Sequence, residues 1–322
     1  MRYFAFHLVL AKTTFQPDEN DSDEIRTASS MGPSPSEGPT SATRDPSQDA
    51  DVLALSPSSS FLAAQMNEDS MDEIDLYKGF SDRLLLLINA ITDLVPYSKT
   101  ADSNSIFITK ARHLKSSLDT LQQHLPEFPA LSSASAPDLA TRKIAISATA
   151  ETYRQGAVIL LHHILTQCHA AAAASASITT MASHPVIIVP AKEQQSAIAS
   201  ILHTIDHHFE TMIHTAALPL WSLFLAGCCV DNNEELRMMA LRIFETIEAK
   251  KRFGNVAPAR MVMEMVWRQR DLGRDQRRSS VAAAAATNSR KVISDPAAAR
   301  QRGLYEWERA AMLLGGWKIS LT

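Results

Sequence analysis

The feature that most constrains the fold is an almost uninterrupted apolar run from Leu218 to Val230, which reads LPLWSLFLAGCCV. A helix that is apolar on every side is either buried in a protein core or inserted in a membrane. This run is shorter than the ~20 apolar residues that a membrane span needs, and no other segment of the chain reaches that length. Proline is tolerated in the first turn of a helix, where its missing N–H would have no partner. The run therefore predicts a buried helix with Pro219 in its first turn, and the chain is not expected to enter a membrane.

Further segments place apolar side chains at the spacing of a helix, most clearly between Ile198 and Met212. The same periodicity predicts helices over residues 84–94, 105–123, 138–168, 233–249, 257–271 and 304–314. The stretch Val186–Val189 is the only strand candidate, and 10 glycines in 322 residues are too few for a design built on tight turns. We expect an all-α fold, an irregular multi-helix bundle of about seven to nine helices.

The N-terminal part of the chain differs in composition from the rest. Residues 13–65 are rich in Ser, Pro, Asp and Thr and have no periodic apolar pattern, so they cannot bury enough surface to offset the entropy of ordering. The apolar start, Phe4 to Ala11, is interrupted by His7 and is short for a secretion signal, which favours a frayed terminus or a gene-model artefact. Residues 66–77 alternate acidic and apolar side chains; a soluble linker is favoured over an activation segment that folds onto a partner. We therefore expect residues 1–75 to be a disordered, acidic, Ser/Pro-rich segment and residues 76–322 to form the helical domain.

Two further segments are expected to be low-complexity loops, near residues 170–190 and 274–301. Charge is also distributed unevenly, since residues 1–100 carry 16 acidic and 7 basic side chains whereas residues 251–322 carry 6 and 14. An acidic head and a basic tail favour a modular protein with different partners at its two ends.

The sequence contains no catalytic constellation. It lacks the glycine-rich phosphate loops and the nucleophile elbow of hydrolases. Its three cysteines, Cys168, Cys228 and Cys229, cannot form a disulfide framework, which favours a reducing compartment, and the adjacent pair lies in the apolar run as small core residues. We expect neither enzyme activity nor a cofactor in this chain.

The weak candidates for metal ligands are His203, His207 and His214, because two histidines four residues apart on a helix can share one ion. On an ideal helix these three residues lie opposite the apolar face of the 198–212 segment, and no glutamate follows the first of them as in a metalloprotease helix. We favour a solvated or helix-packed face over a metal site; a metal-dependent enzyme is the weaker alternative.

Aromatic and basic side chains have structural explanations as well. The four tryptophans, Trp221, Trp267, Trp307 and Trp317, lie in apolar helical contexts and are expected in the core. The run of arginines from Arg268 to Arg278 could contact nucleic acid or direct nuclear import, but Asp271 and Asp275 interrupt it, which favours a solvated helix end.

The order of several motifs resembles the fungal-specific transcription factor domain, the regulatory region that follows the zinc cluster in many fungal gene activators. Leu76–Ser81 with Leu84–Leu94 is similar to its opening helix, Tyr153–Leu161 to its middle helix, and Trp307 with Gly316–Lys318 to its closing segment. The strongest match is carried by eight residues whose role we expect to be structural: Pro219, Trp221, Phe224, Gly227, Arg237, Asn255, Trp267 and Arg268. Trp221 and Phe224 are expected to pack, and Arg237 to pair with a carboxylate or with a helix C-terminus.

The resemblance implies a nuclear regulator of transcription that acts through a helical regulatory domain and through protein partners, as a homo- or heterodimer. The family's zinc module needs six cysteines, and none of the three cysteines lies in the first 160 residues. Zinc would enter only with a cysteine cluster upstream of this sequence, and DNA would be reached indirectly or through that module. The alternative is a stand-alone helical interaction protein, an inhibitor or partner of full-length relatives, which could act in the cytoplasm.

Overall fold

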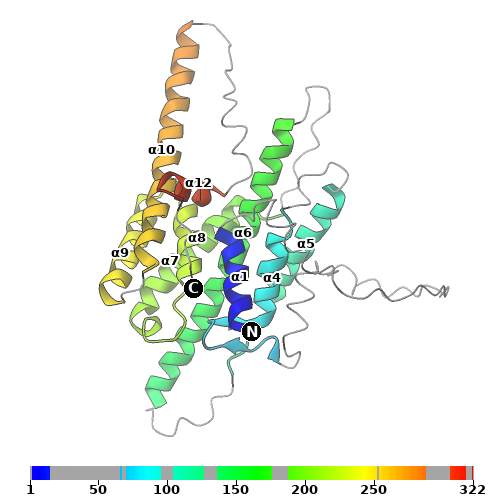
Figure 1. The fold of residues 1–322 in the computed structure, drawn as a ribbon, viewed down its shortest axis with the longest axis vertical. Coiled ribbons are helices and arrows are strands. Elements are labelled where there is room, and N and C mark those ends of the chain that lie inside the picture. The colour runs from blue at the N-terminus through cyan, green and yellow to red at the C-terminus, as the bar shows by residue number, and fades with distance from the viewer. Residues whose placement is uncertain are drawn as a thin grey trace, which may run out of the picture.

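The computed structural model describes residues 2–14, 66, 70–95, 104–126, 136–175, 188–251, 254–287, 305–316 and 321. Within these ranges the chain forms nine α-helices and one two-stranded hairpin, which confirms the all-α expectation. Helix α6 (Ala136–Ser175) runs along the bundle, and the C-terminal end of α10 (Val256–Thr287) projects beyond its neighbours (Figure 1). Between them lies α8 (Leu220–Cys229), which packs against α6, α10 and α7 (Ala191–Met212).

Helix α8 is the centre of the fold, as its apolar composition predicts. All ten of its residues are buried, so it has no face that contacts solvent. Pro219 is its N-cap rather than a residue of the first turn, and the Pro219 carbonyl accepts a hydrogen bond from the Leu223 N–H at 3.0 Å. The helix ends at Cys229, and the N–H of the C-cap residue Val230 donates to the carbonyls of Ala226 and Gly227.

The amphipathic helices bury the faces that their periodicity predicts. The buried residues of α7 are the apolar residues that recur at helical spacing between Ile198 and Met212, together with Ala197. Helix α9 (Glu234–Lys250) begins where the Asn233 side chain accepts a hydrogen bond from the Leu236 N–H at 3.1 Å, which satisfies one free donor of the first turn. Three further helices are α4 (Asp82–Thr92), α5 (Asn104–Thr120) and α12 (Glu306–Leu313).

Both expected low-complexity loops are partly helical, so those predictions are wrong for residues 170–175 and 274–287. Helix α6 continues to Ser175 and α10 to Thr287, through the alanine-rich ends of both segments. Alanine has the highest helix propensity of all residues, so a low-complexity alanine run extends a helix that packing has already nucleated. Residues 176–187 and 288–301 lie outside the described residues.

The expectation of disorder over residues 1–75 is wrong at both ends of that segment. Residues 2–14 form helix α1 (Arg2–Thr14), which packs beside α4 and buries Val9 and Leu10 (Figure 1). The side-chain hydrogen bonds that join α1 to the rest of the fold span 77 to 294 residues of the chain, so no local pattern could reveal them. Residues 15–65 lie outside the described residues.

Residues 70–81 also belong to the folded body. Strand β1 (Ile74–Asp75) pairs antiparallel with β2 (Phe80–Ser81), and the Ile74 N–H donates to the His124 carbonyl at 2.8 Å. The residues from Leu76 to Ser81, which resemble an opening helix, therefore form a turn and a strand, and α4 begins at Asp82. Gly79 makes the turn with φ = 84°, and a Cβ there would lie 2.8 Å from the Ala217 Cβ atom. The described part of the 66–77 segment is thus neither a linker nor a free activation motif.

None of the described helices combines the length and the apolar character that crossing a membrane requires.

Candidate functional site at the end of helix α8

Three of the eight family-like residues, Gly227, Arg237 and Trp267, converge where the C-terminal end of α8 meets α10. Gly227 allows this approach, because a Cβ at that position would lie 2.3 Å from the Met263 Sδ atom of α10. One turn further along α10, the Trp267 indole N–H donates to the Gly227 carbonyl at 2.9 Å. The Gly227 carbonyl also accepts from the Val230 N–H at 3.2 Å, so Trp267 gives this carbonyl a second donor while its ring fills the core. The close approach of the helices at Gly227 and the hydrogen bond from Trp267 therefore join α8 and α10 in one packing unit.

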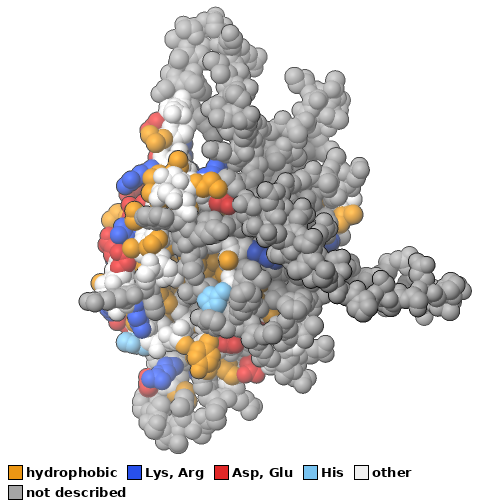
Figure 2. Space-filling model, viewed as in Figure 1, with side chains coloured by type: hydrophobic (Ala, Val, Ile, Leu, Met, Phe, Trp, Pro, Cys, Tyr) orange, Lys and Arg blue, Asp and Glu red, His pale blue; other side chains and the backbone are white. Residues whose placement is uncertain are grey.

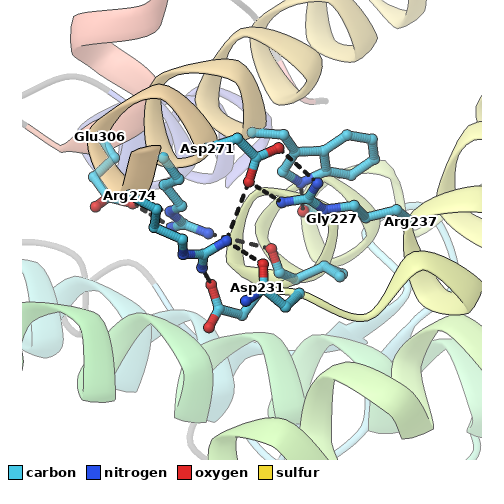
Figure 3. A network of polar contacts seen from close by, with 10 residues as sticks. Gly227, Asp231, Arg237, Asp271, Arg274 and Glu306 are labelled. Carbon is cyan, nitrogen blue, oxygen red and sulfur yellow. Dashed lines mark hydrogen bonds and ion pairs between the residues drawn. The ribbon is translucent and has the colours of Figure 1, made fainter. Parts of the chain in front are cut away.

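Arg237 of α9 attaches to this unit from the other side. Its guanidinium makes two parallel hydrogen bonds to the Asp271 carboxylate, at 2.9 and 3.1 Å (Figure 3). The Arg237 Cζ atom also lies 5.3 Å from the centroid of the Trp267 ring, within the range of a cation–π contact. The side chain is only 12% exposed. Of the two partners that the sequence left open for Arg237, the structure shows the carboxylate.

A second set of ion pairs ties α12 and the α8–α9 loop to the same end of α10. Arg270 donates from Nε to a Glu306 carboxylate oxygen at 2.9 Å and from a terminal nitrogen to the Val230 carbonyl at 3.3 Å. Arg274 pairs with Asp231 and, at 3.1 Å, with Asp271 (Figure 3). We call these six charged residues the α8-end network: Asp231, Arg237, Arg270, Asp271, Arg274 and Glu306. It contains three cations and three anions, so its net charge is zero.

Electrostatics lower the pKa of two carboxylates of the network, Asp271 and Glu306. The hydrogen bond from Arg237 lowers the pKa of Asp271. Burial by itself would raise the pKa of Glu306, but the charge and hydrogen bonds of Arg270 outweigh burial, so that pKa is lowered too. The arginines thus hold both acids in the charged form at neutral pH, and the network can join four elements but offers no free proton donor.

An aromatic cluster lies beside the network. The His163 ring of α6 lies 4.5 Å from the Trp307 ring and 5.9 Å from the Tyr305 ring, between centroids. Burial lowers the pKa of His163 to about 4, although the nearby Glu306 charge favours the protonated ring. His163 is therefore neutral at physiological pH and serves as a packed aromatic side chain.

The other family-like residues occupy different places. Trp221 and Phe224 are both 0% exposed in α8, where the packing hypothesis puts them. Asn255 immediately precedes α10, and its carbonyl accepts from the Ala259 N–H at 3.2 Å. Arg268 points away from the network, with a side chain that is 69% exposed and 3.7 Å from Glu264. Its neighbour Arg270, which the motif comparison omits, makes the buried contacts instead.

Sequence reasoning missed Arg270, Asp271 and Glu306 as site residues. Their partners lie 34 to 40 residues away along the chain, a separation at which periodicity carries no information. The available signal was the interruption of the arginine run by Asp271, which the sequence analysis took as evidence of solvation.

Three of the five arginines in the basic run of α10 lie close to acids, since Arg270 pairs with Glu306, Arg274 pairs with Asp231, and Arg268 lies 3.7 Å from Glu264. Over the flank that carries α9 and α10, basic, acidic and apolar side chains are mixed rather than separated by sign (Figure 2). Such a surface lacks the clustered positive charge that phosphate-backbone binding requires.

The candidate metal ligands are separated from this site. His203 and His207 are exposed on α7, and His214 is exposed after the end of that helix. Within the described ranges, no three His, Cys, Asp or Glu side chains lie close enough together to hold a metal ion. Cys228 and Cys229 are buried, and burial raises the pKa of the Cys229 thiol to about 11, so that this thiol is protonated.

Comparison with known proteins gives one family. The family model described as the fungal specific transcription factor domain matches residues 1–322, which includes the N-terminal helix as well as the body of the fold. Comparison with curated proteins and with solved structures gave no match. The match to the family model confirms the resemblance: this chain belongs to the fungal-specific transcription factor domain family.

Proposed function

We propose that this protein is a nuclear transcriptional regulator whose helical domain acts through protein contacts rather than through direct contact with DNA. Membership of a transcription-factor family supports a role in transcription and gives no support to an enzyme. The observation that carries the choice of protein contacts is the pairing of Arg270 and Arg274 within the α8-end network. These cations neutralise acids of the same fold, so they are not available to a phosphate backbone.

The proposed partners are proteins, either a second copy of this chain or a full-length relative that carries a DNA-binding module. In this scheme DNA is reached through the partner, or through a zinc cluster if one precedes this sequence in the whole protein. No cofactor is needed within the helical domain itself. The α8-end network would hold the loop after α8, α9, α10 and α12 in one arrangement, which presents a fixed surface to the partner.

The first test measures where the protein acts. The full chain is tagged with a fluorescent protein in a fungal host and the nuclear fraction is measured. In parallel, the chain is fused to an unrelated DNA-binding domain and the output of a reporter carrying the matching site is recorded. Nuclear accumulation with a changed reporter output supports the proposal. A cytoplasmic signal with an unchanged reporter contradicts it and favours the stand-alone interaction protein.

A matched pair of substitutions then tests the role of the network. Arg270→Ala removes an arginine that bonds Glu306 and Val230, whereas Arg268→Ala removes an exposed arginine two residues earlier on the same helix. At equal protein level, we expect Arg270→Ala to change the reporter output and Arg268→Ala to leave it unchanged. Arg270→Lys, which keeps the charge but not the fork of donors, should give an intermediate result. Equal outputs from all three variants would remove the network from the regulatory role.

A further inference from the structure

The turn between β1 and β2 presents an exposed aromatic side chain. Tyr77, in this turn, is 81% exposed, and its neighbour Leu76 is 37% exposed. Among the large apolar side chains that are exposed in the described part of the chain, Tyr77 is the most exposed and the only aromatic one. Single apolar side chains on a surface are ordinary, so exposure alone assigns no role to Tyr77. Its role follows from the rigidity of the turn and from the charges around it.

The backbone of the turn is held by hydrogen bonds to Asp75. The Asp75 carboxylate accepts from the N–H groups of Tyr77 at 2.9 Å and of Lys78 at 3.2 Å. The Asp75 carbonyl accepts from the Gly79 N–H at 2.7 Å, which closes the turn. An aspartate that bonds the backbone two residues further on mimics a turn hydrogen bond and stabilises this conformation. The backbone at Tyr77 is therefore fixed before any partner binds.

The residues after the exposed tyrosine anchor the turn to two helices. The Lys78 side chain is 5% exposed, pairs with Asp82 at the start of α4 and lies 3.4 Å from the Asp75 carboxylate. Phe80 is 0% exposed, and its ring centroid lies 4.4 Å from that of Tyr153 in α6. A rigid aromatic anchor loses little conformational freedom when it binds, and tyrosine is enriched among the residues that dominate binding energy. The turn therefore presents its tyrosine in the way that suits a contact residue.

The hairpin segment is acidic. Residues 72–83 carry four acids and two bases, a net charge of −2: Asp72, Glu73, Asp75, Asp82, Lys78 and Arg83. Both bases are already paired, since Lys78 is buried against Asp82 and Arg83 bonds the Asp72 carboxylate at 3.0 Å. Glu73 is exposed. A net negative surface repels the phosphates of nucleic acids and of anionic lipids, and it attracts a surface that carries lysine or arginine.

We infer that the Tyr77 turn, residues 75–79 together with Glu73, is a docking surface for a protein partner that presents an apolar hollow bordered by lysine or arginine side chains. Tyr77 enters the hollow, Leu76 packs against its wall, and the carboxylates of Glu73 and Asp75 face the basic border. The surface is separate from the α8-end network, because β2 packs on α4 and α6. The inference deepens the proposed function by naming a contact surface for its protein partner. Binding alone tests it, so its failure would leave the transcriptional role standing.

The experiment uses the full chain, and its probe is a library of random peptides displayed on phage. The library is selected in parallel on the wild-type chain and on Tyr77→Ala, and circular dichroism verifies that both are folded. We expect peptides that bind the wild type alone and that combine apolar residues with an excess of lysine and arginine over aspartate and glutamate. The inference is overturned if no selected peptide depends on Tyr77, or if the dependent peptides lack a basic excess. Binding to phosphatidylcholine vesicles that Tyr77→Ala abolishes would assign the turn to a lipid surface and overturn it as well.

Matched variants separate the aromatic anchor from the acidic border in binding to the selected peptides. Tyr77→Ala should raise the dissociation constant at least about tenfold, whereas Leu313→Ala, at a position on α12 that is 68% exposed, should leave it unchanged. Glu73→Gln keeps the shape of the side chain and removes its charge, so it should raise the dissociation constant roughly two- to fivefold at low salt. Added salt should remove that difference. Equal binding by Glu73→Gln and wild type at low salt would contradict a basic partner surface, and equal losses at Tyr77 and Leu313 would contradict a specific aromatic anchor.

Discussion

Replacing Gly227 by alanine should destabilise this protein, although alanine is the better helix former. A Cβ at Gly227 would lie 2.3 Å from the Met263 Sδ atom and 3.3 Å from its Cγ atom. Met263 is 0% exposed, so its thioether cannot move into solvent. Overpacking of a core costs about 1–3 kcal/mol, and the gain in helix propensity from glycine to alanine returns ~1 kcal/mol. The net effect is a loss of ~1 kcal/mol, and it reaches ~2 kcal/mol if the α8–α10 spacing cannot adjust.

The chain contains its own control for this substitution. Gly273 also lies inside a helix, α10, but a Cβ there would meet no atom within 4 Å. Gly273→Ala should therefore stabilise the protein by up to ~1 kcal/mol through propensity alone. Glycine-to-alanine substitution should therefore lower the free energy of unfolding at Gly227 and raise it at Gly273. The two variants should differ in stability by ~2 kcal/mol.

The assay is reversible urea unfolding followed by tryptophan fluorescence and by circular dichroism, which must give coincident transitions. A double-mutant cycle with Met263→Ala isolates the contact, since the cost of Gly227→Ala should largely disappear once the thioether is gone. If Gly227→Ala stabilised the protein as much as Gly273→Ala does, the close approach of α8 and α10 would be refuted.

Two further substitutions test the surroundings of this junction. Arg237→Ala should lower the free energy of unfolding by about 1–3 kcal/mol, because it removes two charge-assisted hydrogen bonds made by a side chain that is only 12% exposed. In the same unfolding assay Arg242→Ala should cost less than about 1 kcal/mol, because the Arg242 side chain is 62% exposed. Equal losses would show that the pairing with Asp271 contributes nothing beyond a surface ion pair. Burial lowers the pKa of His163 from 6.5 to about 4. As the pH falls, the unfolded chain therefore binds a proton at this histidine before the folded chain does. The contribution of neutral His163 to the free energy of unfolding is complete above pH 6.5 and should fall by about 3 kcal/mol as the pH drops to 4. His163→Phe should flatten that slope relative to wild type, and His203→Phe at an exposed position should not; parallel curves for all three proteins would contradict a buried neutral His163.

The elements that could be predicted from sequence are those whose burial follows from local periodicity. The buried face of α7 and the complete burial of α8 are both direct consequences of the order of apolar residues. The end of α12 agrees with the helix predicted over residues 304–314. Gly315 and Gly316 follow it with positive φ angles, and the Gly316 N–H donates to the Ala311 carbonyl.

The elements that sequence reasoning missed depend on partners far away in the chain. Helix α1 is short and is followed by a polar segment, and the residues that hold it are Trp221 and Trp307. In the same way, neither Arg270 nor Glu306 has a feature that assigns one to the other across 36 residues. Local composition was also misleading where alanine-rich runs extend α6 and α10, because low complexity was equated with the absence of structure.

The central claim, that this chain regulates transcription, is tested most directly by sequencing nascent RNA after rapid depletion of the protein in a fungal host. The account predicts that a restricted set of transcripts changes soon after the protein is lost. Wild type and Arg268→Ala should restore that set, and Arg270→Ala at equal protein level should not. An unchanged transcript profile after complete depletion would contradict the account.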